Sequence, residues 1–186
     1  MENVIDIRLA LEQIGTGWLF GGSVTDGTEE SWDAVDWEDS RPKPTWPELC
    51  EAHLATVAAK VLVSIDAATS EAIVAGFEYA VDGALYHFSY DTFDQQNFAD
   101  TANVALLAQM GGQGLPESVA WNAYKNWQDG KGELVRLTFT AESFLALYTG
   151  GAVAHKAARM AEGGARKAAL AEAVARGATA EELEAI

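Results

Sequence analysis

The chain has 186 residues, and its 49% hydrophobic content is enough for a packed core in one domain or in two small ones. Its 28 acidic and 12 basic side chains give a formal net charge of −16, which argues against a nucleic-acid partner because such binding relies on lysine and arginine neutralising phosphates. The single Cys50 excludes an internal disulfide framework, and no run approaches the roughly 18 apolar residues of a membrane span.

A short helix is expected first, over residues 3–14. Ile5, Leu9 and Ile14 fall near one face of such a helix, with Leu11 beside it, and would form its apolar side. Gly15 then predicts the end of the helix.

An aromatic ribbon is expected next. Residues 18–20 and residues 31–37 are rich in strand-forming aromatic side chains, and glycine and aspartate lie between them as turn residues. In the second strand Trp32 and Trp37 are five positions apart, which places them on opposite faces at a period of two. One of the two would then lie in the core and the other at the surface or at a joint.

A long helix should begin at Trp46. Thr45 and Glu48 have the spacing of a capping box, in which the threonine oxygen accepts from a free backbone amide and the glutamate reaches back. Apolar residues then recur every three or four positions as far as about Val74, which predicts one continuous helix. The alternative is two helices broken within residues 64–70, because helices longer than about 25 residues need special support.

The next module opens with a β-hairpin signal. Residues 77–81 and 84–88 read as strands, and Asp82-Gly83 between them supplies the positive φ angles of a type I′ turn. A helix over residues 92–110 follows. Its apolar face would be drawn from Phe93, Phe98, Ala102, Ala105, Leu106 and Met110.

The last third of the chain predicts a second hairpin and a long helix. Strands are expected over residues 118–123 and 133–139, joined through a glycine-rich turn, and Thr140 can cap the helix that follows. That helix becomes rich in alanine over residues 152–175, and two glycine pairs weaken it by about 1 kcal/mol per glycine.

The expected fold class is therefore α+β, in four segments. Residues 1–45 form an N-terminal aromatic ribbon module, and residues 46–75 form a long linking helix. Residues 76–150 form a small hairpin-helix-hairpin module, and residues 151–186 form a C-terminal alanine-rich helical segment.

Residues suited to catalysis or to metal binding are scattered. His53, His87 and His155 fall on different expected elements, and no metal-binding motif joins them. Asp91 and Asp94 are better explained as cap and helix-dipole partners than as an acid and a base. We therefore predict a protein that is not an enzyme, holds no metal and no cofactor, and acts by binding.

Two stretches of the chain carry resemblances to phage proteins. Residues 10–49 run through a short helix, two aromatic strands and the stretch Arg41-Pro42-Lys43-Pro44-Thr45-Trp46-Pro47-Glu48-Leu49. This order resembles the XkdW-like family of phage tail proteins, in which a ribbon and a Pro-Thr-x-x-Glu-Leu helix start recur.

The second stretch, residues 77 to about 173, has its own order of motifs. It carries Tyr90-Asp91-Thr92-Phe93-Asp94-Gln95-Gln96 at a helix start, Val119-Ala120-Trp121 in a strand, and Leu137-Thr138-Phe139-Thr140-Ala141-Glu142 at a strand-to-helix step. This order is similar to a second phage family of uncharacterised domains that are often found beside tail-fibre genes.

Together the resemblances imply a bacteriophage tail protein that is made in the host cytoplasm and built into the virion tail as an adaptor or fibre attachment. Two alternatives stay open, a tail-fibre assembly chaperone that is absent from the mature virion, and a protein that binds or cleaves host glycans. The implied partners are other tail or tail-fibre proteins, with neither nucleic acid nor a membrane among them.

Tryptophan and charge suggest where such partners would bind. Trp32, Trp37 and Trp46 are candidate anchors, because aromatic side chains concentrate at interfaces, although core packing and glycan stacking are alternatives. Residues 1–51 hold 12 acidic and 3 basic side chains, whereas residues 152–176 hold 2 acidic and 5 basic ones. This asymmetry favours head-to-tail contact or a basic partner surface. The small residues of the last helix favour self-association or docking through that helix.

Overall fold

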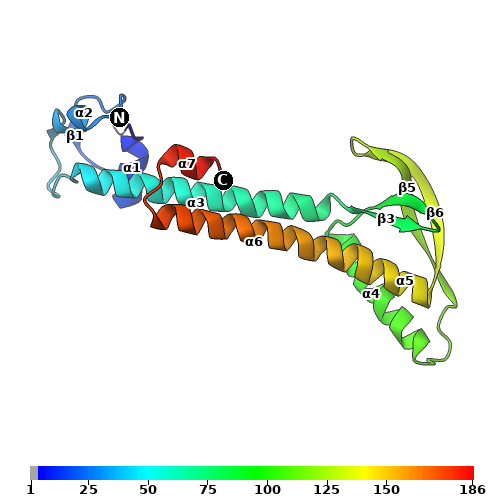
Figure 1. Cartoon of the computed structure of the whole chain (residues 1–186). Coiled ribbons are helices and arrows are strands. Elements are labelled where there is room, and N and C mark those ends of the chain that lie inside the picture. Colours follow the sequence, from blue (N-terminus) through cyan, green and yellow to red (C-terminus); the bar gives the residue numbers. More distant parts are fainter. Residues whose placement is uncertain (1–3) are drawn as a thin grey trace. The chain divides into compact units, whose positions relative to one another are not determined.

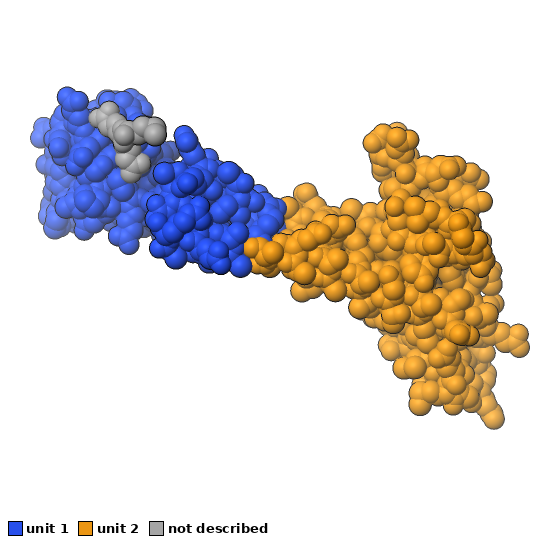
Figure 2. Space-filling view, viewed as in Figure 1, with its two compact units in different colours: residues 1–65, 166–186 blue, residues 66–165 orange. Residues whose placement is uncertain are grey.

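The structure is a computed structural model, and it describes residues 4–186. The fold is 55% helical and 19% strand with two small sheets, which confirms the expected α+β class. Contacts divide the chain into two compact units (Figure 2). Unit 1 comprises Met1–Ile65 and Arg166–Ile186, and unit 2 comprises Asp66–Ala165.

Unit 1 combines the N-terminal elements with the C-terminal end of the chain (Figure 1). Its sheet has two short strands, β1 and β2, which pair antiparallel with Phe20 opposite Trp37. Helix α3 begins in unit 1 and ends in unit 2, whereas α6 begins in unit 2 and ends in unit 1. The elements are α1 (Ile7–Ile14), β1 (Phe20–Gly21), α2 (Glu29–Asp33), β2 (Asp36–Trp37), α3 (Trp46–Val74), α6 (Ala154–Ala175) and α7 (Ala180–Glu184).

Two buried clusters hold unit 1 together. The first joins α1 and the start of α3 around Trp32, and its aliphatic members include Ile7 and Leu49. The second lies where α3 meets the end of α6 and α7. Its members are Val57, Val61, Ile65, Leu170, Ala173, Ala178 and Leu183.

The expectation of a strand over residues 31–37 is wrong for most of its length. Glu29–Asp33 form helix α2, because the Thr28 side chain accepts from the Ser31 amide and two glutamates suit the positive end of the helix dipole. Trp32 therefore lies on a helix. Its ring packs edge to face against Trp37 with 5.7 Å between centroids, instead of on the opposite face of a strand.

The first helix also differs from its expected form. It begins at Ile7 because the Asp6 carboxylate accepts from the Leu9 amide and caps it. The buried side chains of α1 are Ile7, Ala10 and Leu11, whereas Ile14 is exposed. The expected apolar face is therefore only partly correct, because Ile5 and Leu11 are buried, whereas Leu9 is half-buried and Ile14 is exposed.

Helix α3 is continuous from Trp46 to Val74, without the break that was the alternative. Its start confirms the expected capping box. The Thr45 amide donates to Glu48 Oε2 at 2.7 Å, and the Glu48 amide donates to Thr45 Oγ1 at 3.4 Å.

Unit 2 is built on a four-stranded antiparallel sheet in the order β3-β4-β5-β6. The first turn is the expected one, because Asp82 and Gly83 have φ angles of 51° and 79°. The C-terminal helix runs for 35 residues from α5 into α6 through one π-helical stretch, Tyr148–Val153. The elements are β3 (Phe77–Val81), β4 (Ala84–Phe88), α4 (Thr92–Gln109), β5 (Ser118–Gln128), β6 (Lys131–Thr140) and α5 (Ala141–Leu147).

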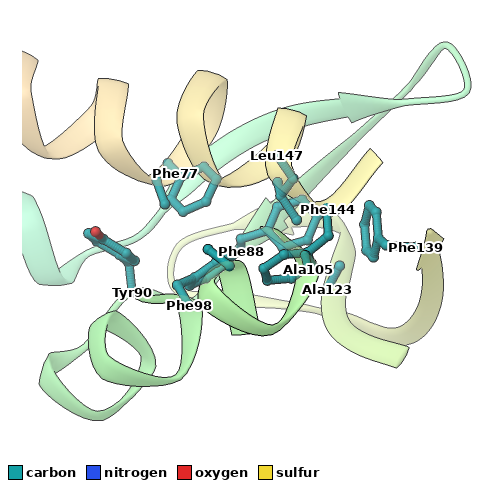
Figure 3. Packing of buried hydrophobic residues seen from close by; sticks show 11 residues of the cluster. Phe77, Phe88, Tyr90, Phe98, Ala105, Ala123, Phe139, Phe144 and Leu147 are labelled. Carbon is teal, nitrogen blue, oxygen red and sulfur yellow. The ribbon is translucent and has the colours of Figure 1, made fainter. Parts of the chain in front are cut away.

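The core of unit 2 lies between one face of this sheet and the helices α4 and α5 (Figure 3). Phe88 of β4, Phe98 of α4 and Phe144 of α5 are fully buried in it. The expected apolar face of α4 is only partly correct. Phe98, Ala102 and Ala105 are buried, but Phe93, Leu106 and Met110 are 76%, 50% and 76% exposed.

Small residues let α6 approach α3 closely within unit 2. Gly163 is buried against Thr69, and a Cβ atom at this glycine would lie 2.3 Å from Thr69 Oγ1. Nearer the start of α6, His155 Nε2 lies 3.0 Å from the carbonyl oxygen of Ile73, which is near the end of α3. The small-residue face of α6 that was expected to meet another copy thus packs on α3 of the same chain, and self-association stays a prediction.

Gly163→Ala and Gly164→Ala form a matched pair that tests this packing. A Cβ atom at Gly164 would have no neighbour within 4 Å, so alanine there should raise the free energy of unfolding by about 1 kcal/mol through helix propensity. Gly163→Ala should lower it, because the two helices must move apart. Urea unfolding followed by far-UV circular dichroism measures both, and equal stabilisation by the two substitutions would contradict the close approach.

Candidate binding site in the N-terminal aromatic cluster

Four aromatic rings pack together at the N-terminal end of unit 1. The Phe20 and Trp37 rings are stacked at 6.2 Å with only 4° between their planes, and Trp18 is tilted against Trp37 at 5.5 Å. Trp32 meets both Phe20 and Trp37 edge to face. Such arrangements stabilise by about 0.5–1.5 kcal/mol per pair beyond area burial, so the two short strands depend on ring packing more than on their few backbone bonds.

Each of three indole N–H groups in this cluster has a backbone carbonyl partner. Trp32 Nε1 donates to the Pro44 carbonyl at 2.8 Å, and Trp37 Nε1 donates to the Arg41 carbonyl at 2.7 Å. Trp18 Nε1 is shared between two carbonyls at the end of α1, at 2.8 and 2.9 Å. These bonds fix the ring orientations, because a buried donor without a partner would cost stability.

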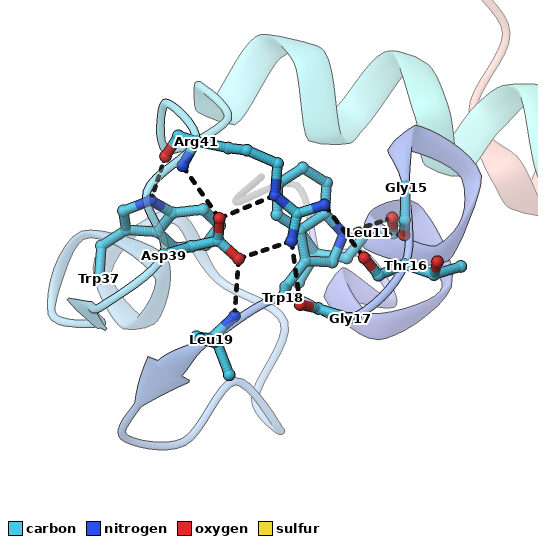
Figure 4. A network of polar contacts seen from close by, with 9 residues as sticks. All are labelled: Leu11, Gly15, Thr16, Gly17, Trp18, Leu19, Trp37, Asp39 and Arg41. Atoms are coloured by element: carbon cyan, nitrogen blue, oxygen red, sulfur yellow. Dashed lines mark hydrogen bonds and ion pairs between the residues drawn. The ribbon is translucent and has the colours of Figure 1, made fainter.

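Arg41 connects the segments around the cluster (Figure 4). Its guanidinium lies 3.7 Å from the centre of the Trp18 ring and donates to both carboxylate oxygens of Asp39. It also donates to the carbonyls of Thr16 and Gly17, at 3.0 and 2.9 Å. A planar donor fork is required for this set of contacts, and lysine could not replace it.

Asp39 is held by the same network. Hydrogen bonds from the side chain and backbone of Arg41 hold the pKa of the Asp39 carboxyl well below its ordinary value of 3.8, with further help from the Leu19 amide. The Asp39 side chain is only 5% exposed. The Asp39 carboxylate therefore stabilises the fold of unit 1 and is not available to bind a ligand.

A groove of about 610 Å³ lies beside this network in unit 1. Ile14, Trp18 and Pro42 contribute apolar surface to it. Its cations are satisfied internally, because Arg41 is bound as described and Lys43 Nζ donates to the carbonyls of Trp32 and Val35 at 2.8 and 3.2 Å. The exposed Glu48 and Glu51 also line it, and Glu48 accepts from Thr45 through Oε2. The groove thus offers an apolar wall with two carboxylates and no free cation among the residues around it.

The three predicted anchors lie in different environments, and none of them lines this groove. Trp32 is 1% exposed, which is the position of a core residue. Trp37 and Trp46 are half-buried and pack at the edge of the same cluster. Partner binding stays a prediction for these two side chains.

The sequence interpretation missed Trp18, Ile14 and Arg41 as groove residues. Arg41 directly precedes Pro42, and nothing in the Arg-Pro-Lys-Pro stretch itself indicates a contact with Trp18. Its contact with Thr16 spans 25 positions, so no local pattern could have revealed it.

The three histidines do not form one cluster, although His87 and His155 line the same pocket of unit 2. Burial lowers the pKa of His53, and its Nδ1 has no partner among the described residues. Burial also lowers the pKa of His87, whose ring stacks on Trp127 at 3.9 Å. Within residues 4–186 no group of three or more histidine, cysteine or acidic side chains is placed to hold a metal ion.

Comparison with known proteins identifies a family for most of the chain. Residues 56–186 match the family described as Domain of unknown function (DUF4376), so the chain belongs to that family. No curated protein and no solved structure matches it. All of unit 2 lies within the matched residues, whereas the aromatic cluster precedes them.

The described helices also bear on the expected absence of a membrane partner. Across residues 4–186, every helix is too short or too polar to cross a lipid bilayer.

Asp39→Asn tests the Arg41 network through its pH dependence. Because the pKa of folded Asp39 lies below 3.8, the ionised carboxylate stabilises unit 1 above that pH, and the contribution is lost as the pH falls through the folded pKa. We expect the substitution to lower the Tm at neutral pH, and the gap from the wild type to narrow as the pH falls toward about 3.

Glu38→Gln is the matched control, because Glu38 is the exposed neighbour of Asp39. It should leave the Tm unchanged throughout. Thermal melts followed by circular dichroism at several pH values provide the measurement, and a gap for Asp39→Asn that stays constant with pH would contradict the role given to its charge.

Proposed function

We propose that the chain is a non-enzymatic bacteriophage tail protein, a structural component of the virion where the tail meets its fibres. Two features support the proposal. Residues 10–49 and residues 77 to about 173 resemble two families of phage proteins. The chain also folds as two compact units, each with its own core, which suits a part that contacts more than one neighbour.

The groove in unit 1 is the observation that carries the binding role. It combines the apolar surfaces of Ile14, Trp18 and Pro42 with the carboxylates of Glu48 and Glu51. Rigid internal bonds hold Trp18 in place through its indole N–H and the guanidinium stacked on its ring. A surface that is already ordered loses less entropy on binding, which favours affinity.

The chemistry of the groove defines the segment that would occupy it. Its cations are engaged inside unit 1, while residues 1–51 carry a net excess of acidic side chains, 12 against 3. A partner segment with an apolar side chain beside lysine or arginine would complement both properties. Such a segment belongs to the neighbouring tail or tail-fibre protein in this proposal.

Mass spectrometry of purified particles tests the proposal. We expect the chain to be recovered from virions of the phage that encodes it in a fixed copy number relative to the major tail protein. Peptides from residues 1–65 and from residues 66–165 should be recovered in equal amounts, because both units belong to one structural part.

A chaperone for fibre assembly gives the opposite result. It would be abundant in infected cells and absent from purified particles, because it leaves before the particle matures. Recovery at a variable trace level that washing with salt removes would also contradict a structural role. A known capsid protein and a known host protein, quantified in the same samples, provide the two controls.

A further inference from the structure

A second groove lies in unit 2, where strand β5 is open on one side. The register pairs β4 with β5 at His87 and Tyr124, after which the chain leaves the sheet at Ser89 and enters α4. Strand β5 continues beside β6, with Ser118 opposite Thr140. The part of β5 just before Tyr124 therefore has β6 on one side and this groove on the other.

Polar side chains from α4, β5 and β6 line this groove. Asp94, Asn97 and Thr101 are spaced by three and four residues, which places them on one face of α4. Asn122 of β5 and Arg136 of β6 are direct cross-strand partners on the opposite wall. The volume is about 350 Å³, near the lower end of the range for small-molecule sites.

Some of these side chains are held in place by one hydrogen bond and keep other donors or acceptors unused. Arg136 Nη1 donates to Asn122 Oδ1 at 3.1 Å, which leaves the Asn122 amide nitrogen and the other guanidinium nitrogens available. The Ser89 hydroxyl donates to one oxygen of the Asp94 carboxylate and leaves the second oxygen available. The groove is thus pre-ordered for a ligand that both donates and accepts hydrogen bonds.

Other polar groups in the groove make no hydrogen bond inside the described part of the protein, although the Tyr124 ring packs against His87 and Trp127. Within residues 4–186 the side chains of Asn97, Thr101 and Tyr124 make no hydrogen bond, although all three are partly buried. These groups are open to solvent in the groove, because His53 Nδ1 is the one buried side-chain nitrogen or oxygen without a partner among the described residues. Their concentration in one hollow indicates a ligand rich in hydroxyl groups.

The charges of the groove exclude strongly ionic ligands. Asp94 supplies one negative charge and Arg136 supplies one positive charge, so the lining is neutral in sum. A phosphate or a nucleic acid would require additional cations, and a cationic ligand would require additional carboxylates. A neutral ligand fits this balance best.

Aromatic rings complete the lining. Trp121 lines the groove and is fixed from behind by Phe98 and Phe144, at 4.4 and 5.1 Å between ring centroids. Tyr124 lines it next to Asn122. Aromatic faces pack against the apolar C–H face of a sugar ring, while planar amide and carboxylate groups bind its neighbouring hydroxyls.

We propose that this groove binds a neutral saccharide, of the size of a mono- or disaccharide unit. Asn97 and Asn122 are the principal hydrogen-bonding residues, and Asp94 and Arg136 bind flanking hydroxyls. Because Trp121 and Asn122 point to opposite faces of β5, the sugar would span the open edge of this strand to contact both. The inference rests on the groove alone and does not depend on the proposed tail function. Its ligand class would suit a protein that meets cell-surface or cell-wall sugars.

The open edge of β5 could instead receive an extended peptide as an added strand. That mode requires pockets for alternate side chains beside the edge, and those pockets are usually apolar. The wall opposite β5 carries Asp94, Asn97 and Thr101, which are all polar. The lining therefore favours a saccharide, and the peptide becomes an outcome of the test.

The test uses the full chain and a panel of neutral saccharides. The probes are mono- and disaccharides of glucose, galactose, mannose and N-acetylglucosamine, titrated to about 10 mM so that a Kd in the millimolar range is detected. Calorimetry measures affinity for the wild type and for Asn97→Ala and Asn122→Ala. The matched control is Asn103→Ala, because Asn103 lies exposed on the same helix and outside the groove.

We expect at least one saccharide to bind, and each groove substitution to weaken its affinity about tenfold through the loss of hydrogen bonds. Asn103→Ala should bind like the wild type. All three variants should stay folded, because each replaces a solvent-accessible amide, and thermal melts verify this.

Three results would overturn the proposal. The first is no binding to any saccharide of the panel. The second is binding that both Asn97→Ala and Asn122→Ala leave unchanged, which would place the sugar elsewhere. The third is that an alternating threonine-valine peptide binds instead and loses affinity in the same two variants, which would assign the groove to strand addition. None of these results bears on recovery of the chain from virions, so the two proposals fail separately.

Discussion

The close approach of α3 and α6 is the contact on which the rest of the structure depends. Within unit 2 the absence of a side chain at Gly163 lets the helix backbone approach Thr69. Within unit 1 Leu170 and Ala173 pack against Val57 and Ile65. An alanine-rich helix gains little from burying its own side chains, so it is stabilised by the larger residues of the helix on which it lies. This packing also explains why the C-terminal residues belong to the same unit as the N-terminal ones.

Local signals predicted the parts of the fold that depend on a few neighbouring residues. The capping pair Thr45 and Glu48 and the Asp82-Gly83 turn were predicted and are present, because each acts through bonds or angles within four positions. The strand expected over residues 31–37 is absent for most of its length, because the sequence before it carries a competing local signal. Thr28 followed by two glutamates is itself a helix start, and it prevails over the strand preference of Trp32.

Which face of a helix is buried depended on contacts far along the chain. Leu106 and Met110 fit a helical apolar face as well as Phe98 does, yet only Phe98 meets α5 and β5, through Phe144 and Trp121. Periodicity cannot distinguish a side chain that meets a partner from one that does not.

Neither groove could be predicted from the sequence, because each is lined by residues that are far apart along the chain. Asn97 and Asn122 carry no motif, and they face one groove only because β4 ends where α4 begins. Likewise Arg41 reaches Thr16 across 25 positions, which positions Trp18 as one wall of the groove in unit 1. Aromatic content correctly indicated the N-terminal part of the chain. Trp32 is a core residue there, whereas Trp18 lines the groove.

The proposed tail function requires unit 1 to dock a basic and apolar segment of a tail partner in the groove beside Trp18. The most direct measurement is the affinity of full-length Glu51→Lys and Glu12→Lys for the tail protein that cross-links to the chain in purified particles. Glu51 lines the groove, whereas the exposed Glu12 carries the same charge in the same unit outside it. We expect Glu51→Lys to weaken the affinity at least about tenfold, and Glu12→Lys to keep an affinity close to that of the wild type. Equal affinity of the two variants, or loss that follows net charge alone, would contradict the proposed docking.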